Sequence, residues 1–169
     1  MREIKAPNEF REDNTEKSTL KIFLAGSIEM GKAKNWQEKV KEQIADMEIY
    51  GEWSQKKEIK ILNPRRDDWD SSWEQSIHNS QFREQVEWEL RAMEAADIIL
   101  LWFEPDTKSP ISLLELGLFA NSEKMAVYCP EGFWRKGNVD VVCEKYGIPH
   151  FETEKDFIDF MNEFIELKV

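Results

Sequence analysis

A continuous apolar segment followed by a proline-opened helix constrains the fold of this chain more than any other feature. Residues 98–103 have the sequence Ile-Ile-Leu-Leu-Trp-Phe, and Pro105 follows just beyond them. A short run of this kind is typical of a strand buried on both faces, as in a parallel sheet. Pro110 suits the first turn of a helix, and in 111–120 seven of ten residues are apolar. We therefore expect this helix to be buried against the sheet.

The rest of the chain alternates between short apolar runs and stretches with helical periodicity. We expect strands over 20–25, 59–62, 125–129 and 148–151, and helices over 33–47, 81–96, 139–146 and 154–167. In the second of these helices the predicted buried stripe is Phe82, Val86, Leu90 and Met93. The alternation predicts a single α/β domain over 19–169 with a parallel sheet. Residues 1–18 carry no period and are expected to form a flexible tail.

The composition limits the compartment and the partners of the protein. The formal charge is −11, which argues against a duplex nucleic acid, because such a partner requires a basic surface. No apolar run approaches the length of a membrane span, and the first residues lack the apolar core of a signal peptide. Cys129 and Cys143 lack the spacing of metal ligands and lie in or near apolar segments. We expect reduced thiols, a cytoplasmic protein and no metal.

Glu115 is the most informative residue of the apolar helix, because a buried carboxylate is costly unless something satisfies it. One interpretation is that its side chain reaches solvent or caps a neighbouring backbone group. The other is that it lies at the carboxyl end of a parallel sheet, where open α/β folds bind their ligands. On that interpretation the nearby helix start favours the negative charge and keeps the carboxylate ionised as a nucleophile.

Two further segments follow predicted strands. Gly26 and Ser27 come directly after the first strand, and a turn of this kind before a helix offers backbone amides to an anion. Arg65 and Arg66 follow the second strand and stand out in an acidic chain. They either belong to a ligand pocket or pair with acidic residues of the segment 67–70.

The polar segment 67–80 contains two tryptophans, Trp69 and Trp73. A long loop at the ligand edge of a sheet is often functional, and exposed tryptophans there can stack on a heterocyclic base. The alternative is that both rings pack the loop onto the domain. His78 lies in the same loop, where a solvated side chain is the commoner case.

Several stretches, taken in order, resemble the nucleoside 2-deoxyribosyltransferase family, in particular its short bacterial and phage branch. They are Phe-Leu-Ala-Gly-Ser-Ile ending at Ile28, Leu-Asn-Pro-Arg-Arg with Asn63, Glu87-Trp88-Glu89 ahead of Asp97, Trp102-Phe103 with Asp106-Thr107, and Pro-Ile-Ser-Leu-Leu-Glu-Leu-Gly over 110–117. The resemblance covers roughly residues 20–145. It implies an α/β fold with a flavodoxin-like, doubly wound parallel sheet of about five strands and helices on both faces.

The resemblance also implies roles for particular residues. Glu115 takes the place of the nucleophilic glutamate of the family, and Glu89, eight residues before Asp97, takes the place of a second acid that is Asp in many members. Many members carry an Asp six residues before the nucleophile, where this chain has Ser109, and the nearest acid is Asp106. The identity of a third acid therefore stays open, and we expect either Glu89 or Asp106 to act as the acid/base or to orient the sugar. The substrate-binding residues that we expect are Gly26, Ser27, Ile28, Asn63, Arg65, Arg66, Trp88, Ser109 and Asn138.

By this resemblance we expect an enzyme that cleaves the N-glycosidic bond of deoxynucleosides through a covalent deoxyribosyl-glutamate and transfers the sugar to another base. In retaining glycosidases, two carboxyls about 5–5.5 Å apart perform the comparable chemistry. One alternative is a 2′-deoxynucleoside 5′-monophosphate N-hydrolase, whose phosphate site would use Gly26, Ser27, Ser109 and an arginine. An alternative of another class is a non-catalytic nucleotide-sensing module.

We expect no cofactor for this activity and small-molecule partners only, namely a deoxynucleoside or deoxynucleotide and a free base. We also expect a homo-oligomer, a dimer or higher. The motive is the apolar pair Phe133-Trp134 close to Asn138, together with the family habit of completing sites across subunits.

Overall fold

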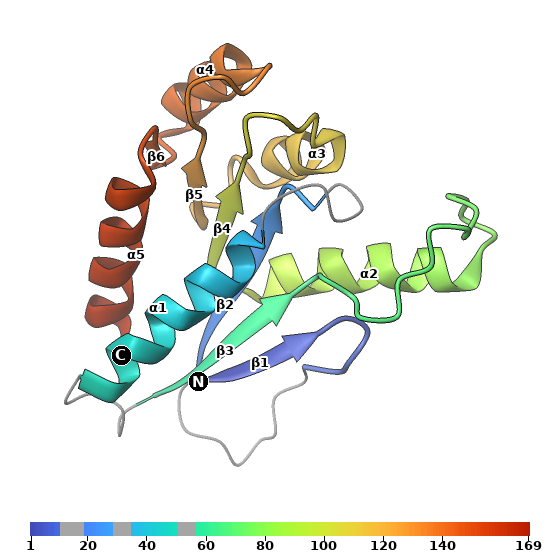
Figure 1. Ribbon diagram of the computed structural model, residues 1–169, viewed down its shortest axis with the longest axis horizontal. Coiled ribbons are helices and arrows are strands. Elements are labelled where there is room, and N and C mark those ends of the chain that lie inside the picture. The colour runs from blue at the N-terminus through green and yellow to red at the C-terminus, as the bar shows by residue number, and fades with distance from the viewer. Residues whose placement is uncertain (11–18, 29–34, 51–56) are drawn as a thin grey trace.

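The computed structural model of the chain describes residues 1–10, 19–28, 35–50 and 57–169 (Figure 1). Within these residues six strands form one sheet in the order β1-β3-β2-β4-β5-β6, and all neighbouring strands are parallel. The strands are β1 (Arg2–Lys5), β2 (Thr19–Gly26), β3 (Glu58–Asn63), β4 (Ile98–Trp102), β5 (Met125–Tyr128) and β6 (His150–Phe151). Without β1, this is the strand order of flavodoxin-like sheets. The predicted fold class is confirmed, with six strands in place of about five.

The additional strand, β1, lies at the edge of the sheet and pairs with β3, from Arg2 beside Lys60 to Lys5 beside Asn63. The predicted flexible tail is therefore wrong for residues 2–5, while residues 11–18 lie outside the described part of the chain. Ile4 is the one fully buried side chain of β1. A short edge strand with a single buried residue has no apolar run or alternation by which its sequence could be recognised.

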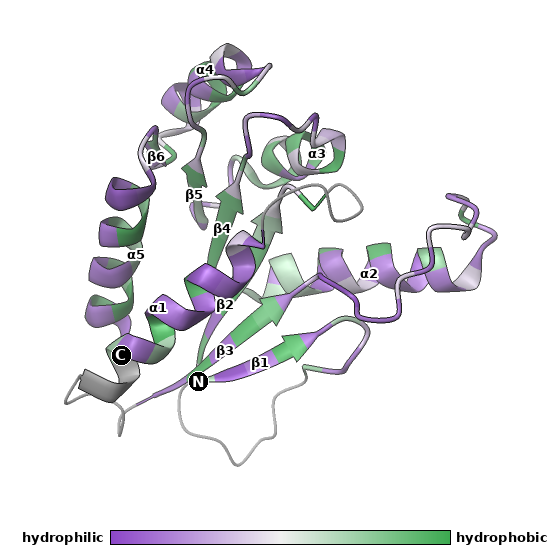
Figure 2. Cartoon of the chain, viewed as in Figure 1, coloured by the Kyte–Doolittle hydropathy of each residue, from purple (hydrophilic) through white to green (hydrophobic). Residues whose placement is uncertain are grey.

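Five helices cover the sheet within the described residues: α1 (Trp36–Tyr50), α2 (Ser80–Ala95), α3 (Pro110–Phe119), α4 (Lys136–Tyr146) and α5 (Glu154–Lys168). Helices α1 and α5 pack on one face, and α2, α3 and α4 pack on the other, so two separate apolar cores flank the sheet (Figure 1). Strands β4 and β5 lie between the two cores, and Figure 2 shows them as mostly hydrophobic. Among the described residues, no helix has the length and apolarity that crossing a membrane would require.

Helix α2 begins at Asn79, whose side chain accepts a hydrogen bond from the backbone N–H of Phe82 at 3.0 Å. Its buried residues are Gln85, Trp88, Ala92 and Met93. The predicted stripe is therefore wrong for Val86 and Leu90, which are each 37% exposed. The buried face and the predicted face lie side by side on the helix. Apolar periodicity favoured the face with Val86 and Leu90, because the buried face carries the polar Gln85.

Helix α3 is buried on only one face. Leu116 is 3% exposed and contacts the core, while Ile111, Leu114 and Leu118 are 59%, 57% and 58% exposed. The expectation of a buried helix is therefore wrong for these three residues, which we call the α3 stripe. Figure 2 shows α3 as hydrophobic over most of its length, so the stripe is an apolar surface on the outside of the fold.

The two cysteines are free and buried, as expected of reduced thiols. Burial raises the pKa of Cys129 and of Cys143 to about 12. Both thiols belong to the core beneath α2, α3 and α4.

Candidate active site

The ends of β2 and β4 meet where the strand order of the sheet reverses, which is where sheets of this kind bind ligands. Gly26 ends β2 beside Trp102 of β4, with a φ of +142°. A Cβ atom at Gly26 would lie 2.2 Å from the carbonyl oxygen of Trp102, so only glycine fits there. The backbone N–H of Ser27 then donates to the same carbonyl at 2.9 Å. This close approach places Ser27 directly over the end of β4.

Three buried hydroxyl groups form a cluster at this point: Ser27, Thr107 and Ser109. The Oγ of Ser27 lies 2.8 Å from the Oγ1 of Thr107 and 2.5 Å from the Oγ of Ser109, and the latter two oxygens are 2.8 Å apart. Thr107 also donates to the carbonyl of Glu104 at 2.9 Å. The structure thus brings together Ser27 and Ser109, two predicted binding residues. Sequence reasoning gave no role to Thr107, although it lies in the motif that carries the family resemblance.

Ser109 is also the residue before α3, and it adopts a left-handed conformation with a φ of 43°. Its side chain makes no capping bond to the helix and turns instead to the hydroxyl cluster. Pro110 occupies the first turn, where its missing N–H leaves no bond unmade. The loop from β4 and the start of α3 are therefore fixed against the end of β2.

Glu115 lies on the buried face of α3 and is 8% exposed. Burial, together with the smaller effect of the nearby charge of Glu89, raises the pKa of this carboxyl to about 8. Glu115 is the sixth residue of α3, beyond the first turn in which a helix dipole acts. The expectation that the helix start keeps Glu115 ionised is therefore wrong in the ligand-free protein, although its predicted burial is confirmed.

Glu89 reaches the same place from α2, on the same side of the sheet. Burial raises its pKa to about 7, against the hydrogen bond that Gln85 donates to it at 2.8 Å. Two neighbouring carboxyls shielded from solvent resist being ionised together, since each destabilises the charge of the other. At neutral pH the pair Glu89 and Glu115 therefore retains at least one proton.

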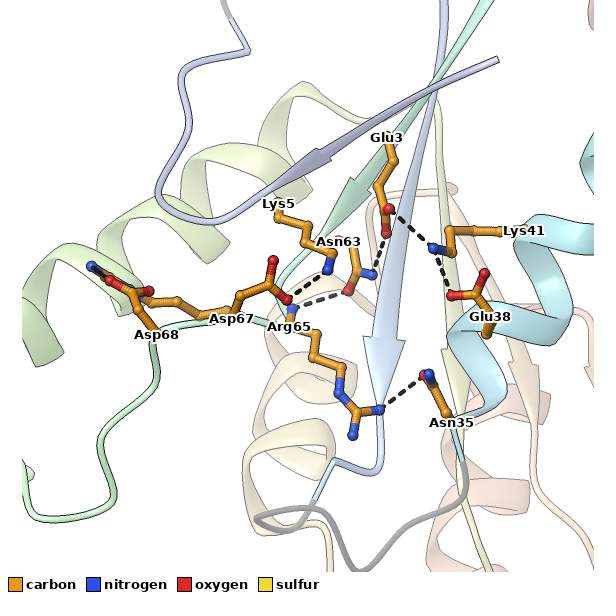
Figure 3. A network of polar contacts seen from close by, with 10 residues as sticks. Glu3, Lys5, Asn35, Glu38, Lys41, Asn63, Arg65, Asp67 and Asp68 are labelled. Carbon is orange, nitrogen blue, oxygen red and sulfur yellow. Dashed lines mark hydrogen bonds and ion pairs between the residues drawn. The ribbon is translucent and has the colours of Figure 1, made fainter.

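A polar network at the end of β3 positions Arg65 (Figure 3). Asn63 is buried, donates to Glu3 of β1 at 2.7 Å and accepts from the backbone N–H of Arg65 at 3.0 Å. Lys41 of α1 binds the same Glu3 carboxylate at 3.0 Å. The guanidinium of Arg65 donates to the side-chain amide of Asn35 at 2.9 Å. Arg65 therefore extends from β3 toward the start of α1 with a neutral partner, while Asn63 has a supporting role.

Arg66 has a different environment. It binds Asp68 at 2.6 Å and Glu84 of α2 at 3.0 Å, and its side chain is 7% exposed. Its guanidinium also lies 5.1 Å from the ring centre of Trp73. Arg66 therefore pairs with an acidic residue of the segment 67–70, as the second of its two interpretations predicted. Trp73 in turn packs against Trp69 at 5.2 Å, so both rings contact their own loop.

The other predicted residues take no part in the contacts described above. Trp88 is 1% exposed and donates to the carbonyl of Asn8 at 2.8 Å, so it is a core residue rather than part of a ligand pocket. Ile28 is half-buried directly after Ser27. Asp106 is exposed in the loop before α3, and Asn138 is exposed in the first turn of α4. Within the described residues, no three His, Cys, Asp or Glu side chains are arranged to hold a metal ion.

A family model described as "Nucleoside 2-deoxyribosyltransferase like" matches residues 19–133 of this sequence. The chain belongs to the nucleoside 2-deoxyribosyltransferase-like family. The family resemblance inferred from the sequence motifs is therefore confirmed. The matched region contains the hydroxyl cluster and both carboxyls, Glu89 and Glu115, whereas Asn138 and β1 lie outside it.

Comparison with solved structures supports the fold of this family member. The crystal structure of a conserved protein from Enterococcus faecalis V583 is similar, with a TM-score of 0.57 over 84% of this chain and 96% of that chain. The two sequences are 11% identical, so the likeness concerns the fold alone. A comparison with curated proteins finds no match.

Proposed function

We propose that this protein cleaves the N-glycosidic bond of 2′-deoxynucleosides and transfers the deoxyribose to another base. The observation that carries the proposal is the pair formed by the half-buried Glu89 and the buried Glu115, each of which has a raised pKa. Buried acidic groups that perturb one another beside a ligand-binding edge are typical of catalytic sites. Membership of the nucleoside 2-deoxyribosyltransferase-like family supports the same class of chemistry.

In the proposed reaction the pair works with one proton, which passes from Glu115 to Glu89 when the bound sugar favours the charged form of Glu115. The carboxylate of Glu115 attacks C1′ of the sugar, the C1′–N bond breaks, and the proton of Glu89 moves to the departing base. This leaves a deoxyribosyl ester on Glu115 and an ionised Glu89. A nitrogen of the incoming base then attacks C1′ and releases Glu115, while Glu89 takes the proton of that nitrogen. Positive charge that develops on the sugar stabilises the Glu115 carboxylate, which opposes the effect of its burial.

The hydrogen balance of the hydroxyl cluster favours a nucleoside over a nucleotide. Four described contacts, three among Ser27, Thr107 and Ser109 and one to the carbonyl of Glu104, compete for three hydroxyl hydrogens. These described contacts therefore lack one hydrogen, while Ser27 also accepts the backbone N–H of Glu104 at 3.1 Å. A sugar hydroxyl can supply that hydrogen, whereas a phosphate presents acceptor oxygens.

A second candidate is the 2′-deoxynucleoside 5′-monophosphate N-hydrolase. Arg65 favours it, because its guanidinium lies at the carboxyl edge of the sheet with a neutral partner, Asn35, and such a group suits a phosphate. The same two carboxyls would act, with water in place of the second base.

The test is to incubate the pure protein with a panel of deoxynucleosides and their 5′-monophosphates, with and without an added free base, and to separate the products chromatographically. We expect that the first base is released, and a new deoxynucleoside formed, only when the second base is present. If base is released without an added free base, and from the 5′-monophosphates but not from the nucleosides, the protein is the hydrolase. Binding without release of base from any compound would refute catalysis and favour the nucleotide-sensing module.

We further propose that the protein is a homo-oligomer, but for a reason that differs from the sequence prediction. Phe133 is 3% exposed and packs 4.5 Å from Phe103 in its own core, so only Trp134 of the predicted pair is exposed. The α3 stripe supplies a stronger motive, because three large apolar side chains on one helix face favour contact with a second copy. The stripe lies on the helix that carries Glu115.

A further inference from the structure

Gln85 of α2 is a buried polar residue to which neither the sequence motifs nor the mechanism above assigns a role. It is 5% exposed and lies one helical turn before Glu89. Its Nε2 donates two hydrogen bonds, to the carbonyl of Pro64 at 2.8 Å and to Oε1 of Glu89 at 2.8 Å. Its own Oε1 is buried without a hydrogen-bond partner. A buried acceptor left in this state is costly, so its presence calls for an explanation.

The carbonyl of Pro64 fixes the orientation of this amide. A backbone carbonyl can only accept, so the group that faces Pro64 must be the Nε2 of Gln85. Turning the amide over would place its oxygen against that carbonyl and would also remove the bond to Glu89. Because Pro64 directly follows β3, the side chain of Gln85 also ties α2 to the edge of the sheet. Glu89 is therefore always presented with an N–H donor.

This donor has a consequence for the protonated form of Glu89. In a carboxylic acid the carbonyl-type oxygen accepts hydrogen bonds better than the hydroxyl oxygen, and Oε1 is the oxygen that accepts from Gln85. We propose that Gln85 is a positioning residue that holds Oε1 of Glu89 as an acceptor, so that the proton which Glu89 exchanges with the base resides on Oε2. That this proton is exchanged with a base rests on the proposed function. The arrangement of the Gln85 and Glu89 side chains does not.

The surroundings of Glu89 make Gln85 its main stabilising contact among the described residues. Burial raises the pKa of Glu89 and the hydrogen bond from Gln85 lowers it. The neighbouring carboxyl from α3 is Glu115, and the charge of Glu89 raises the pKa of Glu115. From the β3 side, Pro64 contributes an uncharged carbonyl, and the nearby Arg66 is paired with Asp68 and Glu84. The Oε1 of Gln85 is left without a partner because the amide is oriented so that its Nε2 donates to Glu89 and Pro64.

The test is the titration of Glu89 in the ligand-free protein, followed by carbon NMR of glutamate side-chain carboxyls and assigned with Glu89→Gln. Gln85→Met keeps the length of the side chain and removes the donor, so the midpoint for Glu89 should rise by about one to two pH units. Gln81→Met, at an exposed position one turn earlier on α2, is the matched control and should leave the midpoint in place. A midpoint that is unchanged or lower in Gln85→Met overturns the proposal.

A second measurement needs no substitution in the core. The side-chain amide signals of Gln85 in the unaltered protein should shift with pH at the midpoint of Glu89, and this shift should vanish in Glu89→Gln. Signals that ignore the titration of Glu89 also overturn the proposal. Neither experiment uses a substrate, so a failure of the proposed function, seen as absence of base release, is distinguishable from a failure of this inference. With an active enzyme, Gln85→Met should move the pH profile of kcat upward with a smaller change in KM.

Discussion

Replacing Glu115 by Gln tests the interpretation of the active site from two directions, because it removes a buried ionisable group and keeps the shape of the side chain. The pKa of Glu115 is raised from 4.5 to about 8 in the folded protein. Between these values the folded chain holds a proton that the unfolded chain has lost, so the free energy of unfolding falls as the pH rises through this window. Glutamine has no such dependence.

The size of the effect follows from the shift. The difference of 8 − 4.5 is 3.5 pH units, and about 1.4 kcal/mol for each unit gives an upper limit of about 5 kcal/mol. Relief of the neighbouring Glu89 and adjustment of the site reduce this figure. We expect Glu115→Gln to equal the unaltered protein in stability at about pH 4 and to exceed it by about 2–3 kcal/mol at about pH 9.

Activity should change in the opposite direction. The amide cannot act as a nucleophile and does not provide the negative charge that stabilises the developing positive charge on the sugar. Turnover by Glu115→Gln should therefore fall at least ~10²-fold. A variant that is more stable at alkaline pH and nearly inactive would have the combination expected of a catalytic group that is held in an unfavourable environment.

The assay for stability is urea unfolding monitored by tryptophan fluorescence across this pH range. Glu94→Gln, at an exposed position of α2, is the matched control and should gain nothing at alkaline pH. The covalent intermediate is tested with a deoxynucleoside fluorinated at the 2′ position, which slows breakdown of the ester so that intact-mass spectrometry detects the added sugar. Peptide mapping should place the sugar on 111–120.

Three results would refute parts of this reasoning. An equal effect of Glu115→Gln on stability at acidic and alkaline pH would mean that Glu115 is not held protonated by burial. An active Glu115→Gln protein would remove it as the nucleophile. A sugar adduct on Glu89 would exchange the roles of the two carboxyls.

Three other changes test the surroundings of the site. Gly26→Ala should destabilise the fold by about 2 kcal/mol or more in urea unfolding, because its Cβ meets backbone atoms, while Gly117→Ala, with open space around it, should not. Leu114→Lys should reduce the mass measured by light scattering if the α3 stripe holds a second copy, and a monomeric unaltered protein would contradict the proposal. Arg65→Ala should raise KM, whereas Arg66→Ala should chiefly lower stability, and an unaltered KM for every substrate would make Arg65 a surface charge.

The parallel sheet and its ligand edge could be predicted because central strands of such sheets have continuous apolar runs. Residues 98–103 have this pattern, and the residues after each strand are brought to one edge by the parallel arrangement itself. Thus Ser27 and Ser109 could be expected near one another, although 82 residues separate them. Strand β1 could not be found in this way, since Ile4 is its single fully buried residue and its place depends on pairing with β3.

The chemical details of the site were less accessible from the sequence. The burial of Gln85 depends on its hydrogen bond to the carbonyl of Pro64, a partner 21 residues away. No local sequence pattern predicts this contact. The burial of Glu115 followed from its apolar helix, and this burial is the main reason for its raised pKa, but the additional effect of Glu89 comes from a different helix. Likewise, Trp88 was predicted to bind substrate, and its burial in the core together with its hydrogen bond to Asn8 identifies it as a core residue.

The position of the two carboxyls on separate helices explains how one site can provide an acid and a nucleophile near neutral pH. Glu89 and Glu115 approach each other over one face of the sheet, where burial alone would protonate both. The bond from Gln85 favours the charged form of Glu89, and a bound sugar that gains positive charge favours the charged form of Glu115. Before substrate binds, each carboxyl opposes the ionisation of the other, so a proton stays within the pair. That proton is what the departing base requires, and the carboxylate exposed by its transfer can recover it from the incoming base.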